Sequence, residues 1–377
     1  AMIVAATPAN PPQTPDPGPV VTPDPGPTTP PVTTPPVVGS VNAFGPAELL
    51  SKVKGAKPGD AIVAKAGLYG DFALRAVDRG GRVTINCEDG VHFERFSFVG
   101  SKDITLRNPT AYPDQTKPFP NSAIINGDAM STGIEVLAAD VSGGIDAGDF
   151  LNWTLQKWQS RKTLGIVLEG QDCRIEDAKL TALGIGAILG GARSSMKRVN
   201  VRGFSIDGLR ARGNGDGWLL EDIDIAYGVT ISTAHPDAIQ CWSVAPGGQP
   251  GSGLMSGLVI RRAYLRQWVG AASAITATMQ GVGLHDGTFD APLIENVTYY
   301  GSSVWGVHVG ACKAPATIRN CKALHINRTK GDRPRIGAAS PISAGNVANK
   351  FTYPLGSGDK IADYSDVKDA PMMSTAA

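Results

Sequence analysis

The chain has 377 residues, a formal net charge of +1 at pH 7, and charged residues at only 18% of its positions. A net charge so close to zero gives no general electrostatic attraction to nucleic acid or to an anionic membrane. No apolar run approaches the roughly 18 residues that a membrane-spanning helix needs. We therefore expect neither a nucleic-acid partner nor membrane insertion.

Residues 1–40 form a separate, proline-rich region. Thirteen of the 28 prolines lie between Pro8 and Pro36, and Thr-Pro-Asp-Pro-Gly-Pro occurs at 14–19 and again at 22–27. Proline lacks an amide donor and fixes φ, so we predict a polyproline-like, semi-rigid stalk or linker. At roughly 3.1 Å per residue, about 30 such residues span on the order of 90 Å. A disordered tail is the alternative.

The first residues, Ala-Met-Ile-Val-Ala-Ala-Thr-Pro, lack the basic and then apolar stretch of a secretory signal. Two explanations stay open. A signal has been removed, or the protein is made in the cytoplasm and loses an initiator Met before Ala1. The second explanation suits a protein that leaves the cell by lysis.

Residues 41–75 are predicted to cover the first coil of the fold. Pro46–Lys54 is amphipathic, starts with proline in the first helical turn and ends near Gly55. A turn at 57–60 and a strand at 61–64 follow it. Further along the chain, apolar residues alternate as in half-buried strands at 83–85, 96–99 and 104–106. Residues 152–158 are predicted to be a helical excursion, and the polar stretch 325–351 is predicted to be loop-like.

Two short phrases recur between residues 175 and 321. The first reads apolar, charged, polar or charged, apolar, and its copies start at Ile175, Met196, Leu220, Ile260, Ile294 and Ile318. The second is a small residue followed by a branched apolar one: Gly184-Ile185, Gly208-Leu209, Ala238-Ile239, Gly281-Val282 and Gly306-Val307. Self-similarity at intervals of 21 to 40 residues signals a solenoid.

Short strands, frequent glycine and irregular insertions favour an all-β fold, a parallel β-helix, over a helical or leucine-rich solenoid. Insertions are tolerated in that fold because loops project outward. The predicted organisation is a stalk or linker at 1–40, the β-helix at 41–350 and a C-terminal tail at 351–377.

The cap phrase resembles the entry to right-handed parallel β-helix proteins of the pectate-lyase-like superfamily. It comprises Ala47-Glu-Leu-Leu, Lys57-Pro-Gly-Asp-Ala-Ile-Val and Gly67-Leu-Tyr-Gly. The coils around Ile294-Glu-Asn-Val and His235-Pro-Asp-Ala-Ile-Gln share the resemblance, which covers roughly 41–325. It implies the fold and leaves the chemistry open, because the superfamily includes lyases, hydrolases, epimerases and phage tailspikes. The polygalacturonase motifs and the calcium carboxylates of pectate lyases are not found here.

The second phrase defines a face of the solenoid. If Leu209, Ile239, Val282 and Val307 point inward, we expect two outward columns beside them. One holds Asp207, Asp237, Gln280 and, shifted by one position, Trp305; the other holds Arg210, Gln240, Gly283 and His308, with Trp242 and His285 beyond.

Coils stack about 4.8 Å apart, so Asp207 and Asp237 should be neighbours with their pKa values split, one as an acid and the other as a base or nucleophile. Such a spacing fits retaining better than inverting glycoside hydrolysis. Arg210 could hold a uronate carboxylate or neutralise an enolate-like charge.

His235-Pro236-Asp237 is the densest spot, because Pro236 forces an extended conformation on His235. We predict Asp237, Asp207, His235 and Arg210 as the catalytic set. The predicted substrate-binding residues are Gln240, Trp242, Gln280, His285, Trp305 and His308, with the tryptophans as flat surfaces for sugar rings and Gly283 leaving a groove.

The alternative is architectural. Asp and Gln ladders in β-helices also satisfy turn backbones, and a slip of one residue would turn one of the two aspartates inward. No zinc set, phosphate-binding loop or nucleophile elbow is found, and the five cysteines lack metal spacing, so we predict no metal and no cofactor.

Three functions follow from these observations. The first is a virion tailspike or fibre protein that binds host surface polysaccharide, with cleavage left open. It would be made in the host cytoplasm, contact virion proteins through the N-terminal stalk, and have a homotrimer as one allowed assembly. The second is a secreted polysaccharide lyase or glycoside hydrolase, and the third is a non-catalytic structural or decoration protein.

Overall fold

The structure is a computed structural model that describes residues 41–114, 116–117, 123–231, 236–267, 278–326, 333–363 and 366. The predicted stalk at 1–40 and His235 lie outside these residues, so both stay predictions. Strands dominate the described part of the chain, and no helix in it is long and apolar enough to cross a membrane.

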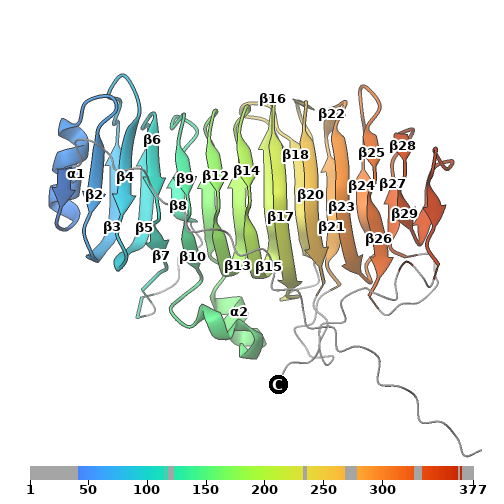
Figure 1. Ribbon diagram of the computed structural model, residues 1–377, viewed down its shortest axis with the longest axis horizontal. Coiled ribbons are helices and arrows are strands. Elements are labelled where there is room, and N and C mark those ends of the chain that lie inside the picture. Colours follow the sequence, from blue (N-terminus) through green and yellow to red (C-terminus); the bar gives the residue numbers. More distant parts are fainter. Residues whose placement is uncertain are drawn as a thin grey trace, which may run out of the picture. The chain divides into compact units, whose positions relative to one another are not determined.

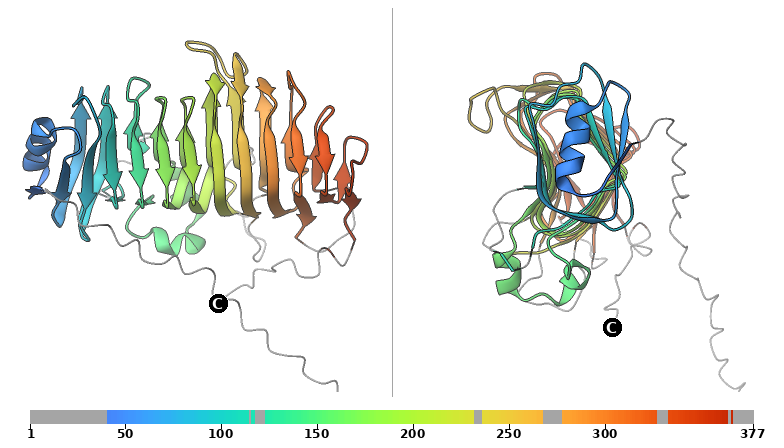
Figure 2. Two further views of the ribbon diagram at one scale, coloured as in Figure 1. Left: turned by 45° about the horizontal axis from the view of Figure 1, so that its top comes forward. Right: turned by 90° about the vertical axis from the view of Figure 1, so that its left-hand side faces the viewer.

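The strands wind into successive coils, and each full coil adds one parallel strand to each of three faces (Figures 1 and 2). The fold is therefore the predicted parallel β-helix. Face 1 contains β3 (Gly67–Arg75), β5 (Val91–Val99), β8 (Ala123–Gly127), β11 (Leu164–Leu168), β13 (Lys179–Leu189), β15 (Asn200–Gly213), β18 (Asp237–Ser243), β21 (Gln280–Asp286), β24 (Trp305–Val309), β27 (Arg335–Gly337) and β30 (Lys350–Phe351).

Faces 2 and 3 complete each coil. Face 2 contains β1 (Val41–Ala43), β2 (Ala61–Ala64), β4 (Val83–Cys87), β6 (Ile104–Arg107), β9 (Glu135–Leu137), β12 (Arg174–Glu176), β14 (Ser195–Lys197), the first part of β17 (Leu219–Gly228), of β20 (Val259–Arg266) and of β23 (Leu293–Gly301), then β25 (Thr317–Arg319) and β28 (Ile342–Ala344). Face 3 contains the first parts of β3, β5, β13 and β15, the last parts of β17, β20 and β23, and β7 (Thr110–Ala111), β10 (Asp140–Ser142), β26 (Lys322–His325), β29 (Val347–Ala348) and β31 (Lys360–Ile361).

A small additional sheet joins faces 1 and 2 in the middle coils. It consists of β16 (Gly215–Asp216), β19 (Leu254–Ser256) and β22 (Thr288–Asp290). Met255 and Phe289 are paired in it and buried.

The N-terminal end of the core is closed by the predicted helix. Helix α1 (Pro46–Gly55) has proline in its first turn, Lys52 and Lys54 in its last turn, and Leu49 and Val53 fully buried. Cations near a helix C-terminus interact favourably with the helix dipole, and the two apolar side chains cover the first coil. The helix at the blue end of Figure 1 confirms the prediction.

The predicted excursion forms two short helices at the corner between faces 3 and 1: η1 (Ala147–Asn152) and α2 (Leu155–Ser160). Thr154 caps α2 by accepting a hydrogen bond from the Lys157 N–H. Phe150 and Trp158 pack edge to face at 6.2 Å. Phe150 also lies over Gly203, where an added Cβ would come within 2.7 Å of its ring. The excursion is therefore packed onto the coil.

The coils continue further along the chain than the sequence pattern indicates. Part of the stretch 325–351, which was predicted to be loop-like, forms the strands β27, β28, β29 and β30. Beyond it, β31 still pairs with β29 in parallel. These strands are only two or three residues long, so the alternation that identifies a strand has too few positions to be seen.

The first repeated phrase is the corner between faces 2 and 3. Its first and last positions are core residues in every copy. Its third position has a positive φ, between 51° and 56°, in Asp177, Arg198, Asp222, Arg262, Asn296 and Asn320. The left-handed residue turns the chain from one face to the next, which explains why the phrase recurs once per coil.

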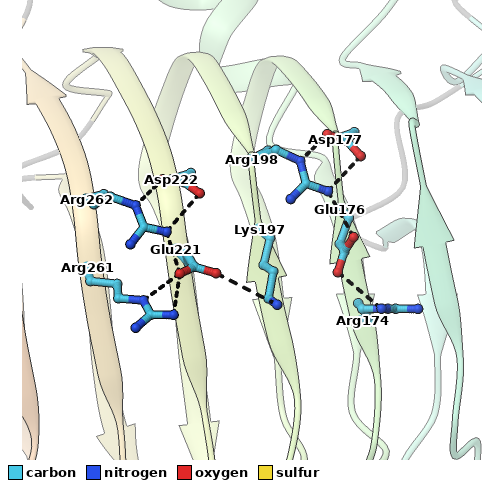
Figure 3. A network of polar contacts seen from close by, with 9 residues as sticks. All are labelled: Arg174, Glu176, Asp177, Lys197, Arg198, Glu221, Asp222, Arg261 and Arg262. Carbon is cyan, nitrogen blue, oxygen red and sulfur yellow. Dashed lines mark hydrogen bonds and ion pairs between the residues drawn. The ribbon is translucent and has the colours of Figure 1, made fainter. Parts of the chain in front are cut away.

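The second position of this phrase forms a ladder of alternating charge on face 2. The column runs Glu176, Lys197, Glu221, Arg261, Glu295 and Arg319, each in register with the next. Figure 3 shows how residues of the third position join it: Arg198 reaches Asp177 at 2.6 Å and Glu176 at 3.0 Å, and Arg262 reaches Asp222 at 2.6 Å. Every carboxylate in the column thus has a cation beside it.

The second phrase is the corner between faces 3 and 1, and its first predicted copy is wrong by two residues. Ala187, not Ile185, is in register with Leu209, and the pairing of β13 with β15 is irregular between Leu183 and Ile185. The four later copies are in register as predicted, with Leu209, Ile239, Val282 and Val307 fully buried.

Candidate functional site

The two predicted columns on face 1 are confirmed by the strand register. Asp207 pairs with Asp237, which pairs with Gln280. Arg210 pairs with Gln240, which pairs with Gly283, which pairs with His308. Trp305 stands two residues before Val307, as Gln280 stands before Val282, so the shift of one position in the sequence prediction is not needed.

Alternation is interrupted at the corner, and this places Asp207 beside Arg210. Both residues of the second phrase face the core: Leu209 is fully buried, and a Cβ on Gly208 would meet Ile225 at 3.0 Å. The Arg210 guanidinium donates to Asp207 Oδ2. Asp207, Asp237 and Gln280 are only 3%, 2% and 7% exposed. The side chains of Asp207, Asp237 and Gln280 therefore lie on the outer side of the coil but are buried, whereas the sequence predicted a solvent-exposed column.

Asp207 holds the start of the next coil. Its Oδ1 accepts a hydrogen bond from the backbone N–H of Asp237 at 2.9 Å, and its Oδ2 is bound by Arg210. Pro236, just before Asp237, has no N–H of its own, and its carbonyl accepts from the Gln280 N–H at 2.9 Å. Three adjacent coils are thus tied together where face 1 begins.

Asp237 has the most strongly altered acidity of the site. Burial raises the pKa of its carboxyl to about 8, and the nearby Asp207 charge adds to that rise, while Arg210 acts in the opposite direction. The carboxyl is therefore protonated at neutral pH and can act as an acid. A raised pKa at one of the two neighbouring carboxyls is what we expected.

His285 lies between Asp237 and His308. Its Nε2 is 3.8 Å from Asp237 Oδ2, and its Nδ1 is 3.1 Å from His308 Nδ1. One of the two facing Nδ1 atoms carries the shared hydrogen, since a hydrogen bond needs one donor and one acceptor. The two rings are stacked, with centroids 4.9 Å apart and an interplanar angle of 23°. His285 is 24% exposed and so connects the buried acid with the surface.

Gly283 provides the space that His285 occupies. A Cβ built on Gly283 would lie 2.1 Å from His285 Nε2, so the imidazole folds back over the glycine. The groove expected at Gly283 is therefore filled by a neighbouring side chain. The sequence analysis identified both residues but not this contact, because the spacing of residues does not show that the His285 side chain turns back over Gly283.

His308 is held neutral over most of the pH range. Burial lowers the pKa of its imidazole to about 4, and the neighbouring His285 contributes to the same direction. Trp305 also packs against the His308 ring, at a centroid distance of 4.4 Å. Trp305 and His308 are both partly exposed.

Trp242 differs from the open sugar platform that the sequence predicted. Its side chain is 7% exposed, and the Arg210 guanidinium lies 5.2 Å from its ring centroid. Of the two tryptophans, only Trp305 offers partly open surface. Gln240 is partly exposed between the Arg210 and Gly283 rungs, while the predicted catalytic His235 lies outside the described residues.

In the described ranges, no three His, Cys, Asp or Glu side chains come together as metal ligands. The five cysteines are free thiols, and Cys241, next to the site in sequence, is fully buried in the core. The titratable side chains that lie together here include one carboxyl and two imidazoles, which can donate or accept protons.

Comparisons with known proteins return solved structures alone: no family model and no curated protein matches the sequence. The chain is similar to pectate lyase Pel9A, with 10% identity over 87% of this chain and 79% of that chain and a TM-score of 0.46. It is similar to the A-module of the mannuronan C-5 epimerase AlgE6 of Azotobacter vinelandii, with 9% identity, coverage of 84% and 94%, and a TM-score of 0.44.

A third similar structure is the catalytic domain of a GH87 α-1,3-glucanase, with 11% identity, coverage of 88% and 65%, and a TM-score of 0.43. Likenesses at this level do not align individual residues. The site is therefore interpreted from its own geometry.

Proposed function

We propose that the protein binds a polysaccharide along face 1 and cleaves it by acid–base catalysis at Asp237, His285 and His308. One observation carries the proposal: a buried carboxyl that is protonated at neutral pH lies 3.8 Å from a partly exposed imidazole. Strongly altered acidity beside a specific partner on an accessible face is typical of a catalytic group. The similar structures named above include enzymes whose names refer to polysaccharides.

A polysaccharide suits the shape of this surface. The side chains of face 1 repeat at the coil spacing of about 4.8 Å, close to the length of one sugar unit in an extended chain. Arg210, Gln240, Gly283 and His308 follow one another along the solenoid axis, and Trp305 lies on the same strand as His308. They supply a charged contact, an amide contact, and then an imidazole and an aromatic contact in one coil. An extended chain of sugars lying across the strands would meet these groups in successive coils, with His285 folded over the glycine in the coil before His308.

The proton path begins at the buried acid. Asp237 is 2% exposed, and the two ring nitrogens of His285 face Asp237 and His308, so the acid acts through both imidazoles. As the C–O bond breaks in hydrolysis, Asp237 gives its proton to His285 Nε2, His285 passes its Nδ1 proton to His308 Nδ1, and His308 gives its Nε2 proton to the leaving oxygen. The attacking water then gives a proton to His308 Nε2, and the reverse transfers return one to Asp237. In elimination, His308 Nε2 takes the proton from the carbon next to a uronate carboxyl and gives it to the leaving oxygen.

The test is cleavage of surface polysaccharide from the natural host by the full chain. Reducing ends without new ultraviolet absorbance would identify hydrolysis, and reducing ends with the absorbance of an unsaturated uronate would identify elimination. Asp237→Asn and His285→Ala should each lower the rate by about 100-fold or more. Asp172→Asn, which changes an ion pair with Arg193 away from the site, should leave the rate unaltered. Equal rates in wild type and both site variants would remove the catalytic assignment.

If the chain binds the polysaccharide but does not cleave it, only the proposed binding along face 1 remains. In that case His308→Ala and Trp305→Ala should weaken retention on immobilised polysaccharide. If the chain neither binds nor cleaves any host glycan, the structural or decoration role is the remaining hypothesis.

The finer part of the proposal is that the β-helix belongs to a virion tailspike or fibre, with a secreted enzyme as the alternative. Its support is the composition of residues 8–36, which suits a semi-rigid spacer that holds a binding domain away from an attachment point. Mass spectrometry and antibody labelling of purified virions test this placement. Detection in the culture medium of intact cells, and not on virions, would favour the secreted enzyme.

A further inference from the structure

We propose that Asp207 and Arg210 act as a positioning pair for Asp237. Arg210 binds the carboxylate of Asp207, and Asp207 in turn fixes the backbone of Asp237 and favours the protonated form of its carboxyl. This inference rests on the proposed function, whose acid is Asp237. It replaces the two-carboxylate mechanism that the sequence predicted, in which Asp207 itself was the second catalytic group.

Asp207 is poorly placed to meet a substrate. It is 3% exposed, Arg210 binds its Oδ2, and the Asp237 N–H binds its Oδ1. A nucleophile or base needs a free lone pair directed at the reacting atom. Both oxygens of Asp207 are instead turned to the protein, so a retaining mechanism with two free carboxylates does not fit.

The bond to the Asp237 N–H determines where the acid stands. Asp237 is the first residue of β18, and Pro236 before it contributes no donor of its own. The side chain of Asp207 therefore anchors the point at which the chain enters face 1. A shift of that point would move the Asp237 carboxyl relative to His285, and a misplacement of about 1 Å can cost 100-fold in rate.

The charge of Asp207 has a second effect. A fixed negative charge beside a buried carboxyl opposes its ionisation, whereas a positive charge favours it. Arg210 stabilises the ionised form of Asp207, and its guanidinium is also held against Trp242. The titratable and charged groups of described residues that face Asp237 from the elements around it are Asp207 and Arg210 of β15, Cys241 of β18, His285 of β21 and Tyr299 of β23. Of these, the Asp207 and Arg210 pair can be altered while the core and the imidazoles are kept.

The experiment measures the titration of Asp237 itself, by carbon-detected NMR of the full chain labelled at its aspartate carboxyl carbons. The signal is assigned with Asp237→Asn. In Asp207→Asn, an oxygen acceptor for the Asp237 N–H is kept while the charge is lost, so the midpoint of Asp237 should fall by about one pH unit or more. In Arg210→Gln, the positive charge that favours ionisation of Asp237 is lost, so the midpoint at which Asp237 loses its proton should move to higher pH.

Opposite shifts in the two variants are the expected result, because a merely structural role would not produce opposite signs. Asp172→Asn serves as the matched control, since it neutralises one member of an arginine–aspartate pair elsewhere, and it should leave Asp237 unchanged. Unchanged midpoints in both variants, or shifts in the same direction, would overturn the inference.

This readout does not depend on turnover. If the chain cleaves no polysaccharide but the opposite shifts appear, the positioning pair stands and the proposed function fails. If cleavage is seen and depends on Asp237 without such shifts, the function stands and the positioning pair fails.

Discussion

Faces 1 and 2 stack the same kinds of side chain at the same coil spacing, with opposite results. On face 2, anionic and cationic rungs alternate, so Glu221 contacts Lys197, Arg261 and Arg262 (Figure 3). Burial alone would raise the pKa of Glu221, but hydrogen bonds from the two arginines lower it below its usual value. On face 1, the carboxyls of Asp207 and Asp237 occupy consecutive coils, and Arg210 is the arginine beside them. The pKa of Asp237 rises to about 8.

The comparison shows that the charges beside a buried carboxyl help to decide whether it keeps its proton. On face 2 the arginines offset the burial of Glu221, and the alternating ion pairs contribute register and stability. On face 1 burial is the main cause of the raised pKa of Asp237, and the neighbouring charge of Asp207 adds to it, so this carboxyl keeps its proton at neutral pH.

The largest effect is expected from closing the space beneath His285. In Gly283→Ala the new Cβ would lie 2.1 Å from the present position of His285 Nε2, so the imidazole has to leave Asp237 and His308. The rate of polysaccharide cleavage should fall by about 100-fold. The control is the same change in a His285→Ala background, where it should add little. A large additional loss there would mean that Gly283 matters for another reason.

Charge reversal in the face 2 ladder should mainly affect stability. Glu221→Lys places three cations around one rung, and we expect a loss of about 1–3 kcal/mol in the free energy of unfolding. Thermal unfolding at low and high salt checks this, because salt should recover part of the loss. The corresponding change at Asp172, which has a single exposed partner in Arg193, should cost about 0.5 kcal/mol or less. Equal losses at both positions would contradict the role of alternation.

The pH dependence of cleavage should sharpen the contrast on face 1. Asp237 must carry its proton, so the rate should fall as pH rises through about 8, by tenfold per pH unit above it. His308 must be neutral, so the rate should fall as pH drops below about 4. An initial-rate profile that extends below pH 4 and above pH 8 measures both limbs. An alkaline limb near pH 6 or below would show that a different group supplies the proton.

The smallest effect is expected at the left-handed corner position of the ladder. Arg262 has a φ of 53° and bonds to Asp222 and Glu221. In Arg262→Asn the ion pairs are lost, but asparagine tolerates this backbone conformation better than arginine. The two effects oppose each other, so the free energy of unfolding should change by about 0.5 kcal/mol or less in chemical denaturation. A loss above about 2 kcal/mol would show that the ion pairs dominate.

Much of the fold could be predicted from the sequence, because each coil repeats the same corner. The register of Asp207 with Asp237 follows from the spacing of the recurring phrases, and the helix at 46–55 follows from its amphipathic pattern and its first-turn proline. The first copy was misplaced because Gly184-Ile185 fits the pattern of a small and a branched apolar residue, whereas the residue in register with Leu209 is the alanine of Gly186-Ala187.

The candidate site was predicted less completely than the fold. Its residues were identified, but their contacts depend on side-chain directions that the spacing does not give. His285 bends back over Gly283, and Arg210 turns to Asp207 while covering Trp242. The burial of Asp207 and Asp237 was also not foreseen, since an outward position in a solenoid normally implies exposure.

The alternating ladder has a consequence for how such a chain can change length. Removing one coil between Glu176 and Arg319 would bring two like charges next to each other, whereas removing two adjacent coils would restore opposite neighbours. Gene duplication or deletion in this part of the molecule should therefore be tolerated in steps of two coils. A pair of coils, one with an anionic rung and one with a cationic rung, is therefore the unit by which this solenoid can grow or shrink.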